Sequence, residues 1–316
     1  MKIKKRKLEI EGNFDKITNL KNTNGSYSLV NPSTRKFIIK HLNESNVLEN
    51  YLFKNLKERQ IKDLFDYLNY DFFLLLDFKD KEVLNIGCGE GTESLFFAKY
   101  GAKQVYSFEL NPERLNMLEQ RAKKMNLHKK IYLFNGDFTE VKLKGDSFDI
   151  ITSIGVLEWL PKKEPFKEMI QNLTKIRQAL RKKGKVLVTI ENRLNPIYFL
   201  GFTHHHEIPF APLMPRFIAN ILTKLFKGKP YLTHTYTKNI YIKIFRNAGF
   251  KNIEIYPVLF GYQEPQFVIN SVKMYRHFLR KYGFKLSLEI GGALLSLLPD
   301  FILSRIVPAY VIIGEK

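Results

Sequence analysis

The run from Val83 to Thr92 constrains the fold of this chain more than any other stretch. Its first half is apolar up to Ile86 and is typical of a buried strand, and the glycines that follow it indicate a tight turn. Leu95-Phe96-Phe97-Ala98 then supplies the apolar face of a helix. Strand, glycine turn and helix form the first unit of a doubly wound α/β sheet, and such sheets bind their ligand at this turn.

The spacing of the glycines separates two kinds of nucleotide-binding turn. A dinucleotide-binding turn has a third glycine or an alanine at the position that Thr92 occupies here. The observed order, Gly87-x-Gly89-x-Gly91, instead resembles motif I of the class I S-adenosylmethionine-dependent methyltransferases. The resemblance implies that S-adenosylmethionine is the cofactor and that these glycines, with Cys88, belong to its site.

Alternating apolar segments after residue 80 predict a mainly parallel sheet with crossover helices. We expect strands at 82–86, 104–109, 131–134, 148–153, 185–190, 251–257 and 309–313, and helices at 91–100, from Asn111 onward, at 164–182 and at 238–248. By the resemblance, these elements form a Rossmann-like, doubly wound, seven-stranded sheet. Its last strand is expected to run antiparallel, between the fifth and the sixth.

Side chains that follow the second and third predicted strands can bind the nucleoside part of a cofactor. Glu109 ends the second strand, where a carboxylate can accept hydrogen bonds from both ribose hydroxyls, and Leu110 beside it is included in the site. Asp137 can accept a hydrogen bond from the adenine amino group, and Phe138 can lie against the ring. Each acid alone is equally well explained as a surface residue, but acids at consecutive strand ends favour a binding site.

The segment after the fourth strand, Ser153 to Leu160, resembles the part of these methyltransferases that lines the methionine end of the donor. Ser153 and Gly155 are assigned to the cofactor site on that resemblance. The chain departs from the family at Asn85, where an acid usually contacts the amino acid portion of the donor. An asparagine can still accept one hydrogen bond there.

A narrower resemblance begins after the fifth strand with Glu191-Asn192-Arg193, followed by Tyr198-Phe199-Leu200-Gly201 and His206. The order is similar to that of bacterial and archaeal methyltransferases found among cell-surface polysaccharide enzymes. Those proteins have an acid-acid-histidine triplet where this chain has three histidines at 204–206. Any role of the two acids therefore does not carry over to this chain.

Methyl transfer to a hydroxyl needs positioning and a base of near-neutral pKa, which favours histidine. The candidates are residues 204–206, among which the resemblance favours His206, and His234; hydrogen bonding within a loop is the alternative explanation. Glu158 and Glu191 can hold acceptor hydroxyls or the ammonium group of the donor. Adjacent histidines on an extended chain point to opposite faces and no zinc-type spacing is present, so we expect no metal.

The expected elements divide the chain into four parts. Residues 1–76 form a partly helical N-terminal extension, 77–192 the cofactor-binding core, 193–235 an acceptor-side insertion, and 236–316 the rest of the core. Helical insertions thus follow the fifth and sixth strands, the second of them at 263–304.

Residues 216–227 are predicted to form an amphipathic basic helix with one apolar stripe. We expect the stripe to face the core and to cover the acceptor pocket. The alternative is that the helix docks on a membrane surface.

Composition bounds the partners and the compartment. The net charge of +20 favours an anionic partner, although a lysine-rich surface explains it equally well. The one cysteine, Cys88, excludes an internal disulfide and fits a reducing compartment. No apolar stretch reaches the roughly 18 residues of a membrane span, so we expect a cytoplasmic protein that can lie at the inner face of a membrane.

These features together predict O-methylation of a sugar or small-molecule hydroxyl in surface glycan or glycolipid biosynthesis, on an acceptor that can be lipid-linked. An RNA methyltransferase is the first alternative; the charge favours it, but no RNA-binding module is recognisable. A non-catalytic scaffold of the same fold at a membrane is the second alternative. The oligomeric state is not predicted.

Overall fold

The computed structural model describes residues 10–11, 14–15, 75–203, 208–258, 276, 279 and 295–316. Most of the expected N-terminal extension, the histidines at 204–206 and most of the expected insertion at 263–304 lie outside these residues. The core elements are β3 (Glu82–Ile86), α4 (Thr92–Lys99), β4 (Gln104–Glu109), α5 (Pro112–Lys124), β5 (Ile131–Gly136), β7 (Phe148–Ile154), α6 (Pro165–Ala179), β8 (Leu180–Glu191), α9 (Lys238–Asn247), β9 (Lys251–Val258) and β10 (Ala309–Glu315). Shorter elements are β1 (Ile10–Glu11), β2 (Phe14–Asp15), η3 (Phe138–Glu140), β6 (Lys142–Leu143), η4 (Leu157–Trp159), α7 (Pro196–Phe199), η5 (Ala211–Leu213), α8 (Arg216–Lys227) and α12 (Asp300–Leu303).

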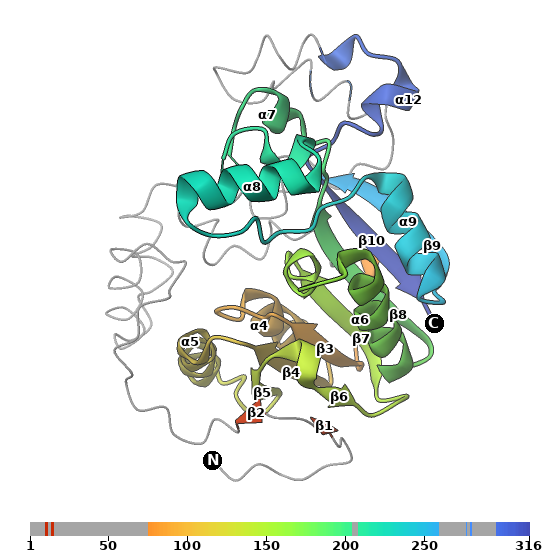
Figure 1. Ribbon diagram of the computed structural model, residues 1–316. Helices are drawn as coiled ribbons and strands as arrows, with labels where there is room; N and C mark the ends of the chain where they lie inside the picture. The colour runs from red at the N-terminus through yellow and green to blue at the C-terminus, as the bar shows by residue number, and fades with distance from the viewer. Residues whose placement is uncertain are drawn as a thin grey trace, which may run out of the picture.

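The main sheet has the strand order β2-β5-β4-β3-β7-β8-β10-β9 (Figure 1). Strands β5, β4, β3, β7 and β8 are parallel, and β10 pairs antiparallel with both β8 and β9. The expected seven-stranded, Rossmann-like fold is confirmed, including the antiparallel last strand between the fifth and sixth. The short β2 adds to the edge at β5. Because the chain winds outward from β3 in both directions, the carboxyl ends of β3, β4 and β7 border one crevice.

Local chemistry explains where the helices begin. Asn111 caps α5 by accepting a hydrogen bond from the Glu113 backbone N–H at 2.9 Å, and Pro112 follows at the first helical position. Helix α6 also begins at a proline, and the Glu168 carboxylate reaches back to accept from three backbone N–H groups before the helix. Such caps satisfy donors that have no partner inside a helix.

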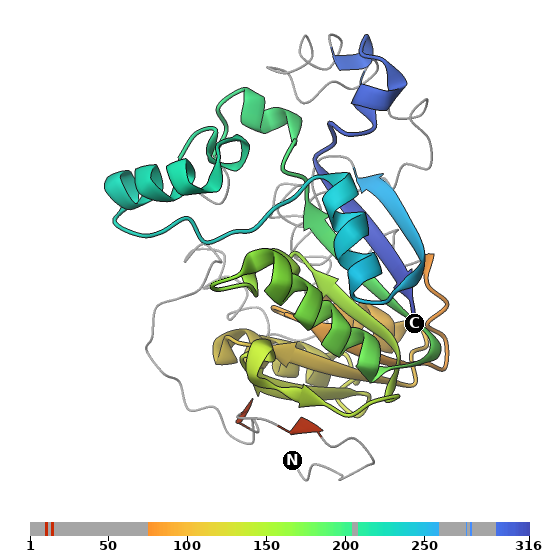
Figure 2. The same ribbon diagram turned by 45° about the vertical axis from the view of Figure 1, so that its right-hand side comes forward.

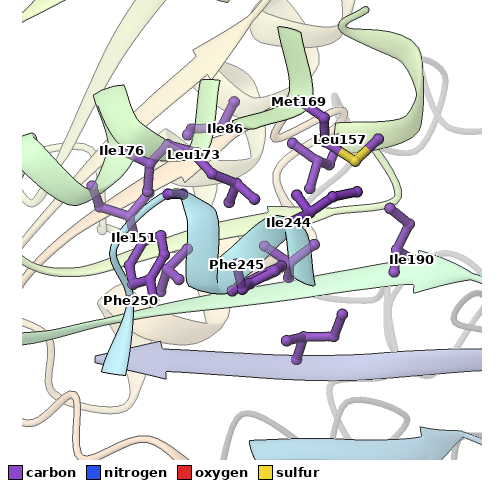
Figure 3. Close-up of a cluster of buried hydrophobic side chains, with 14 of the residues drawn as sticks. Ile86, Ile151, Leu157, Met169, Leu173, Ile176, Ile190, Ile244, Phe245 and Phe250 are labelled. Carbon is purple, nitrogen blue, oxygen red and sulfur yellow. The ribbon is translucent and has the colours of Figure 1, made fainter. Parts of the chain in front are cut away.

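Helices cover both faces of the sheet, with α6 and α9 on one face and α4 and α5 on the other (Figures 1 and 2). The first face buries Met169, Leu173 and Ile176 of α6 with Ile244 and Phe245 of α9 (Figure 3). The second face buries the predicted apolar run of α4. Because both faces are covered, most residues of β3, β4 and β7 are buried whichever face they point to, including polar ones such as Asn85 and Ser107.

Helix α6 ends earlier than the sequence pattern predicts. The expected helix 164–182 stops at Ala179, and β8 already begins at Leu180. Lys183 has φ 63°, and the pairing of β8 with β7 shifts register between Phe148 and Ile150. The charged residues before Gly184 therefore belong to an irregular start of the strand rather than to the helix.

The insertion after β8 contains α7, η5 and α8, which stand off the sheet (Figure 2). Helix α8 has the bounds expected from the sequence, but the expectation that its apolar stripe faces the core is wrong. Phe217, Ile221 and Leu225 are exposed, whereas Ala219 and Thr223 are buried. Among the described residues, no helix has the length and apolar character needed to cross a bilayer.

The packing of α6 predicts a large stability cost for Leu173→Ala. Leu173 is fully buried between the sheet and α9, so truncation removes apolar contacts and leaves a cavity. We expect a loss of about 2 to 5 kcal/mol in the free energy of unfolding, measured by denaturant titration. The exposed Lys167→Ala on the same helix serves as the control, and equal costs for both variants would contradict the packing described here.

Candidate cofactor and acceptor site

The three glycines of the turn after β3 have different surroundings. All have positive φ, namely 69° at Gly87, 52° at Gly89 and 83° at Gly91. A Cβ at Gly87 would lie 2.3 Å from Val156 Cγ2, and one at Gly91 would lie 2.1 Å from Leu118 Cδ1. A Cβ at Gly89 would meet nothing closer than an Arg114 nitrogen at 3.9 Å. Two glycines thus permit close packing, while Gly89 leaves the backbone open to a ligand.

The carboxylate of Glu109 lies against this turn. Its Oε2 accepts a hydrogen bond from the Gly89 backbone N–H and its Oε1 accepts one from Asn111, each at 2.9 Å. The side chain is held at the carboxyl end of β4, beside the open face of Gly89. Leu110 is 67% exposed at the same strand end. A fixed carboxylate next to an open glycine fits a ribose, and the exposed apolar side chain beside it fits a base.

Asn85 is fully buried and is used inside the protein. Its Nδ2 donates to Ser94 Oγ at 3.0 Å, and its Oδ1 accepts from Thr152 Oγ1 at 3.1 Å. Ser107 donates in turn to Ser94, so the network joins β3, β4, β7 and α4. The amide therefore stabilises the packing beneath the turn, and its contact with a donor molecule stays a prediction.

Asp137 and Phe138, the two residues after β5 that are predicted to bind adenine, lie in different environments. Asp137 caps η3 by accepting from the Thr139 backbone N–H at 2.8 Å and forms an ion pair with Lys162 at 3.0 Å. Burial raises the pKa of Asp137, but hydrogen bonds from Thr139 and Lys162 outweigh it and lower the pKa below its usual value. Phe138 lies in the core against Phe108, with 4% of its surface exposed, rather than beside an open site.

Cys88, Ser153 and Gly155 lie at the strand ends as expected. Burial raises the pKa of the Cys88 thiol well above its usual value, so the thiol stays protonated and is no nucleophile. Ser153 is fully buried, and its Oγ has no hydrogen-bond partner within the described part of the chain. Gly155 has φ 62° and its N–H donates to Thr189 at the end of β8. Val156, which follows it, is the residue that packs on Gly87.

The two predicted acceptor-side glutamates lie around one tyrosine. The Tyr241 hydroxyl donates to the Glu191 backbone carbonyl at 2.9 Å, and the Glu191 carboxylate accepts from the Tyr198 hydroxyl at 2.5 Å. Glu158 in η4 is fully buried. Burial raises the pKa of Tyr241 well above its usual value, and the negative charges of Glu158 and Glu191 raise it further. Both glutamates therefore lie close enough to Tyr241 to affect its ionisation, although they come from different strand ends.

A cleft of about 510 Å³ lies beside this cluster, under the insertion after β8. The polar side chains on its wall include Arg193, Arg216, His234 and Tyr236. Phe166, Pro165, Ala211, Pro212 and Met214 supply apolar surface. The His234 backbone N–H donates to the Glu158 carbonyl at 3.0 Å, so the cleft wall is joined to the segment that crosses the glycine turn.

His234 is held as a neutral group. Burial and, to a smaller extent, the neighbouring charge of Arg216 together lower its pKa to about 4. Its Nε2 lies 3.2 Å from Arg216 Nη2, and because a guanidinium only donates, this nitrogen accepts. The lone pair that a base would need is already engaged, so His234 positions the cleft wall. The base favoured by resemblance, His206, lies outside the described residues and stays a prediction.

Sequence reasoning missed Glu93, in the first turn of α4 directly after the glycine turn. Its pKa is raised to about 7, chiefly by burial and to a smaller extent by the charge of Glu90. A carboxylate with a raised pKa at a ligand-binding turn marks a candidate site residue. The acidic residue after the glycines was the available indication in the sequence. Within the described ranges, no three His, Cys, Asp or Glu side chains gather as a metal site would require.

Comparison with known proteins finds similarity to methyltransferases. Residues 84–188 match a family model described as a methyltransferase domain. The chain is 32% identical over 115 residues to protein arginine N-methyltransferase 1 of Schizosaccharomyces pombe, covering 35% of this chain and 32% of that protein. It is 28% identical over 179 residues to demethylmenaquinone methyltransferase of Lactobacillus johnsonii, covering 54% and 68% of the two chains. A crystal structure of an S-adenosylmethionine-dependent methyltransferase from Mesorhizobium loti aligns with a TM-score of 0.48 at 16% identity, over 79% of this chain and 98% of that one.

The match assigns residues 84–188 to a methyltransferase domain, and the strand order and the glycine turn agree with that assignment. S-adenosylmethionine is the cofactor of that class, and the open face of Gly89 beside the Glu109 carboxylate fits it. The chain spans only about a third of the arginine methyltransferase that it matches.

The surroundings of Gly87 and Gly228 predict that substitution by alanine lowers the unfolding free energy by different amounts at the two positions. Gly87 and Gly228 have nearly the same φ, 69° and 68°, but a Cβ at Gly228 meets nothing within 4 Å. Gly228→Ala should cost about 1 kcal/mol, from backbone strain alone. Gly87→Ala should cost about 1 to 3 kcal/mol more, because the methyl group overlaps Val156. Equal losses of unfolding free energy in denaturant titrations would show that the turn does not pack as described.

The raised pKa of Glu93 predicts that its effect on stability depends on pH. Its pKa is about 7 in the folded protein against 4.5 for a free glutamate side chain, so deprotonation opposes folding, and stability is lost as the pH rises between these values. In the cofactor-free protein, Glu93→Gln should raise the unfolding free energy at pH 8 by up to about 3 kcal/mol. The gain should shrink toward pH 4.5. A gain that does not vary with pH would contradict the assignment.

Proposed function

We propose that the protein transfers a methyl group from S-adenosylmethionine to a hydroxyl of a sugar or another small acceptor in surface glycan or glycolipid biosynthesis. The observation that carries the proposal is the cleft of about 510 Å³ next to the segment after β7. Its volume is that of a small-molecule site, and a few polar groups converge on largely apolar walls. His234 on its wall is hydrogen-bonded to Glu158, in the segment that packs on the glycine turn, and this link supports a role in holding the acceptor.

The donor is assigned to the carboxyl ends of β3 and β4. When bound, S-adenosylmethionine supplies a methyl group on a sulfonium, which is transferred by in-line displacement and needs positioning above all. Gly89 offers open backbone, and Glu109 offers its carboxylate to the ribose hydroxyls. Glu93 lies in the first turn of α4, where it can meet the donor's ammonium group in place of the usual acid at position 85.

Acceptor hydroxyls are assigned to Glu158 and Glu191. Their proximity around Tyr241 supports this role, because a pair of carboxylates can orient a polyol by accepting its hydrogen bonds. His206 is assigned, on the resemblance alone, as the base that accepts the proton of the reacting hydroxyl. Arg216 keeps its charge beside the cleft while it holds the backbone carbonyls of Tyr231 and Thr233.

Two other functions stay as alternatives. The net charge of +20 favours an RNA acceptor. A cleft with apolar walls, however, favours a small acceptor over a nucleic acid. The relatives named above are an arginine and a demethylmenaquinone methyltransferase, and each matches only part of this chain. A non-catalytic scaffold would bind the donor but would transfer its methyl group to no acceptor.

Donor binding is predicted to depend on Gly89 and Glu109. Gly89→Arg fills the open face of the turn, and Glu109→Ala removes the carboxylate that holds the turn and faces the ribose. Both variants should lower S-adenosylmethionine affinity by at least about 100-fold in calorimetry, since a buried partner of a charged hydrogen bond is lost or blocked. The exposed Glu140→Ala is the matched control. Wild-type affinity in either site variant would place the donor elsewhere.

Acceptor identity is tested with a donor carrying a labelled methyl group. Sugar nucleotides, lipid-linked sugars, transfer RNA and an arginine-containing peptide should be offered in parallel, and label should enter only the sugar-containing acceptors. His206→Ala should slow this transfer by about 10²- to 10⁴-fold and leave donor affinity unchanged. Transfer to RNA alone, or none to any acceptor, would favour the first or the second alternative. Full activity of His206→Ala would exclude it as the base.

A further inference from the structure

Helix α8 presents its apolar stripe to solvent. Phe217, Ile221, Leu225 and Phe226 are 67%, 61%, 73% and 68% exposed. Three of them follow one another at a spacing of four residues and therefore lie on one face of the helix. A surface helix of a globular protein normally buries its apolar face, so an exposed stripe of this size marks an interaction surface.

The opposite face of α8 attaches the helix to the protein. Ala219 and Thr223 are buried there, and Ala219 packs in a small apolar cluster with Tyr231. Arg216 donates to the carbonyls of Tyr231 and Thr233, and Asn220 accepts from the Tyr231 N–H at 3.2 Å. Small and polar residues thus face inward, with Leu222 half-buried at the edge of the same cluster, and these contacts fix the orientation of the helix. The apolar face points away from the core because of them.

The charges around the stripe are all positive. Lys224 and Lys227 lie in the last turn of α8, and Lys229 follows its C-cap; all three residues are exposed. The sequence contains no aspartate or glutamate from Ile208 to Ile253. Such a surface matches an anionic one, whereas an interface with a second copy of this chain would bring the same lysines together. Apolar side chains bordered by lysines are the pattern of helices that lie in a bilayer interface.

We propose that α8 docks this protein on an anionic lipid bilayer, with the stripe in the headgroup region and the three lysines on lipid phosphates. The proposal deepens the proposed function and rests on it for the nature of the acceptor. Arg216 and Tyr231 both hold α8 and line the cleft. Docking would hold the cleft close to the bilayer surface, where a lipid-linked sugar is presented. Figures 1 and 2 show α8 standing clear of the sheet, as such docking requires.

The test is flotation of the full chain with vesicles of phosphatidylcholine alone or with phosphatidylglycerol added. The wild type should bind the anionic vesicles, and binding should weaken in about 0.5 M salt. Phe217→Gln with Leu225→Gln should lower the partition coefficient by at least about tenfold, and so should the charge reversal of Lys224, Lys227 and Lys229 to glutamate. Matched controls are Tyr100→Gln with Ile240→Gln, and charge reversal of the exposed Lys129, Lys144 and Lys182.

The outcomes are distinct from those of the donor test. All variants should bind S-adenosylmethionine like the wild type, because none touches the glycine turn. Absence of wild-type binding to anionic vesicles, equal binding to neutral ones, or full binding by either α8 variant would overturn the proposal. A wild-type dimer in light scattering that becomes monomeric in Phe217→Gln/Leu225→Gln, without vesicle binding, would assign the stripe to a second copy instead. If the wild type did not bind S-adenosylmethionine, the proposed function would be overturned instead.

Discussion

The packing of Val156 on Gly87 and the hydrogen bond from Gly89 to Glu109 are the contacts on which the site depends. The first holds the segment after β7 across the turn, and the second fixes a carboxylate from β4 beside it. A side chain at Gly87 would push the crossing segment away, and the cleft wall attached to Glu158 would move with it. The glycine turn and the cleft wall are therefore joined mechanically through the segment after β7.

Most of the fold could be predicted because its determinants are local or repeat along the chain. Apolar strands, a capping Asn111 before Pro112 and the glycine spacing each specify an element, and alternation of strands with helices leaves few topologies. The end of α6 was predicted too late because Leu180 pairs with Phe148 of β7, a long-range contact without a local sequence pattern. The antiparallel last strand came from family resemblance and not from periodicity.

The site was predictable in position but less so in detail. Strand-end residues such as Glu109 follow from topology, whereas Phe138 depends on which face of a short 3-10 turn is covered, and it is buried. Asn85 and His234 have their polar atoms engaged by partners far away in sequence, which a linear pattern does not reveal. The stripe of α8 was correctly located, but its direction depends on contacts of Arg216 and Asn220 with the following loop. Amphipathicity identifies the face and leaves its orientation to tertiary structure.

Calorimetry of the purified wild-type protein with S-adenosylmethionine and, separately, with NAD tests the central claim most directly. The turn has open backbone at Gly89 and lacks the third glycine of a dinucleotide site, since Thr92 occupies that position. The account predicts binding of S-adenosylmethionine at one site per chain and no measurable heat with NAD. Binding of NAD alone, or of neither ligand, would contradict it.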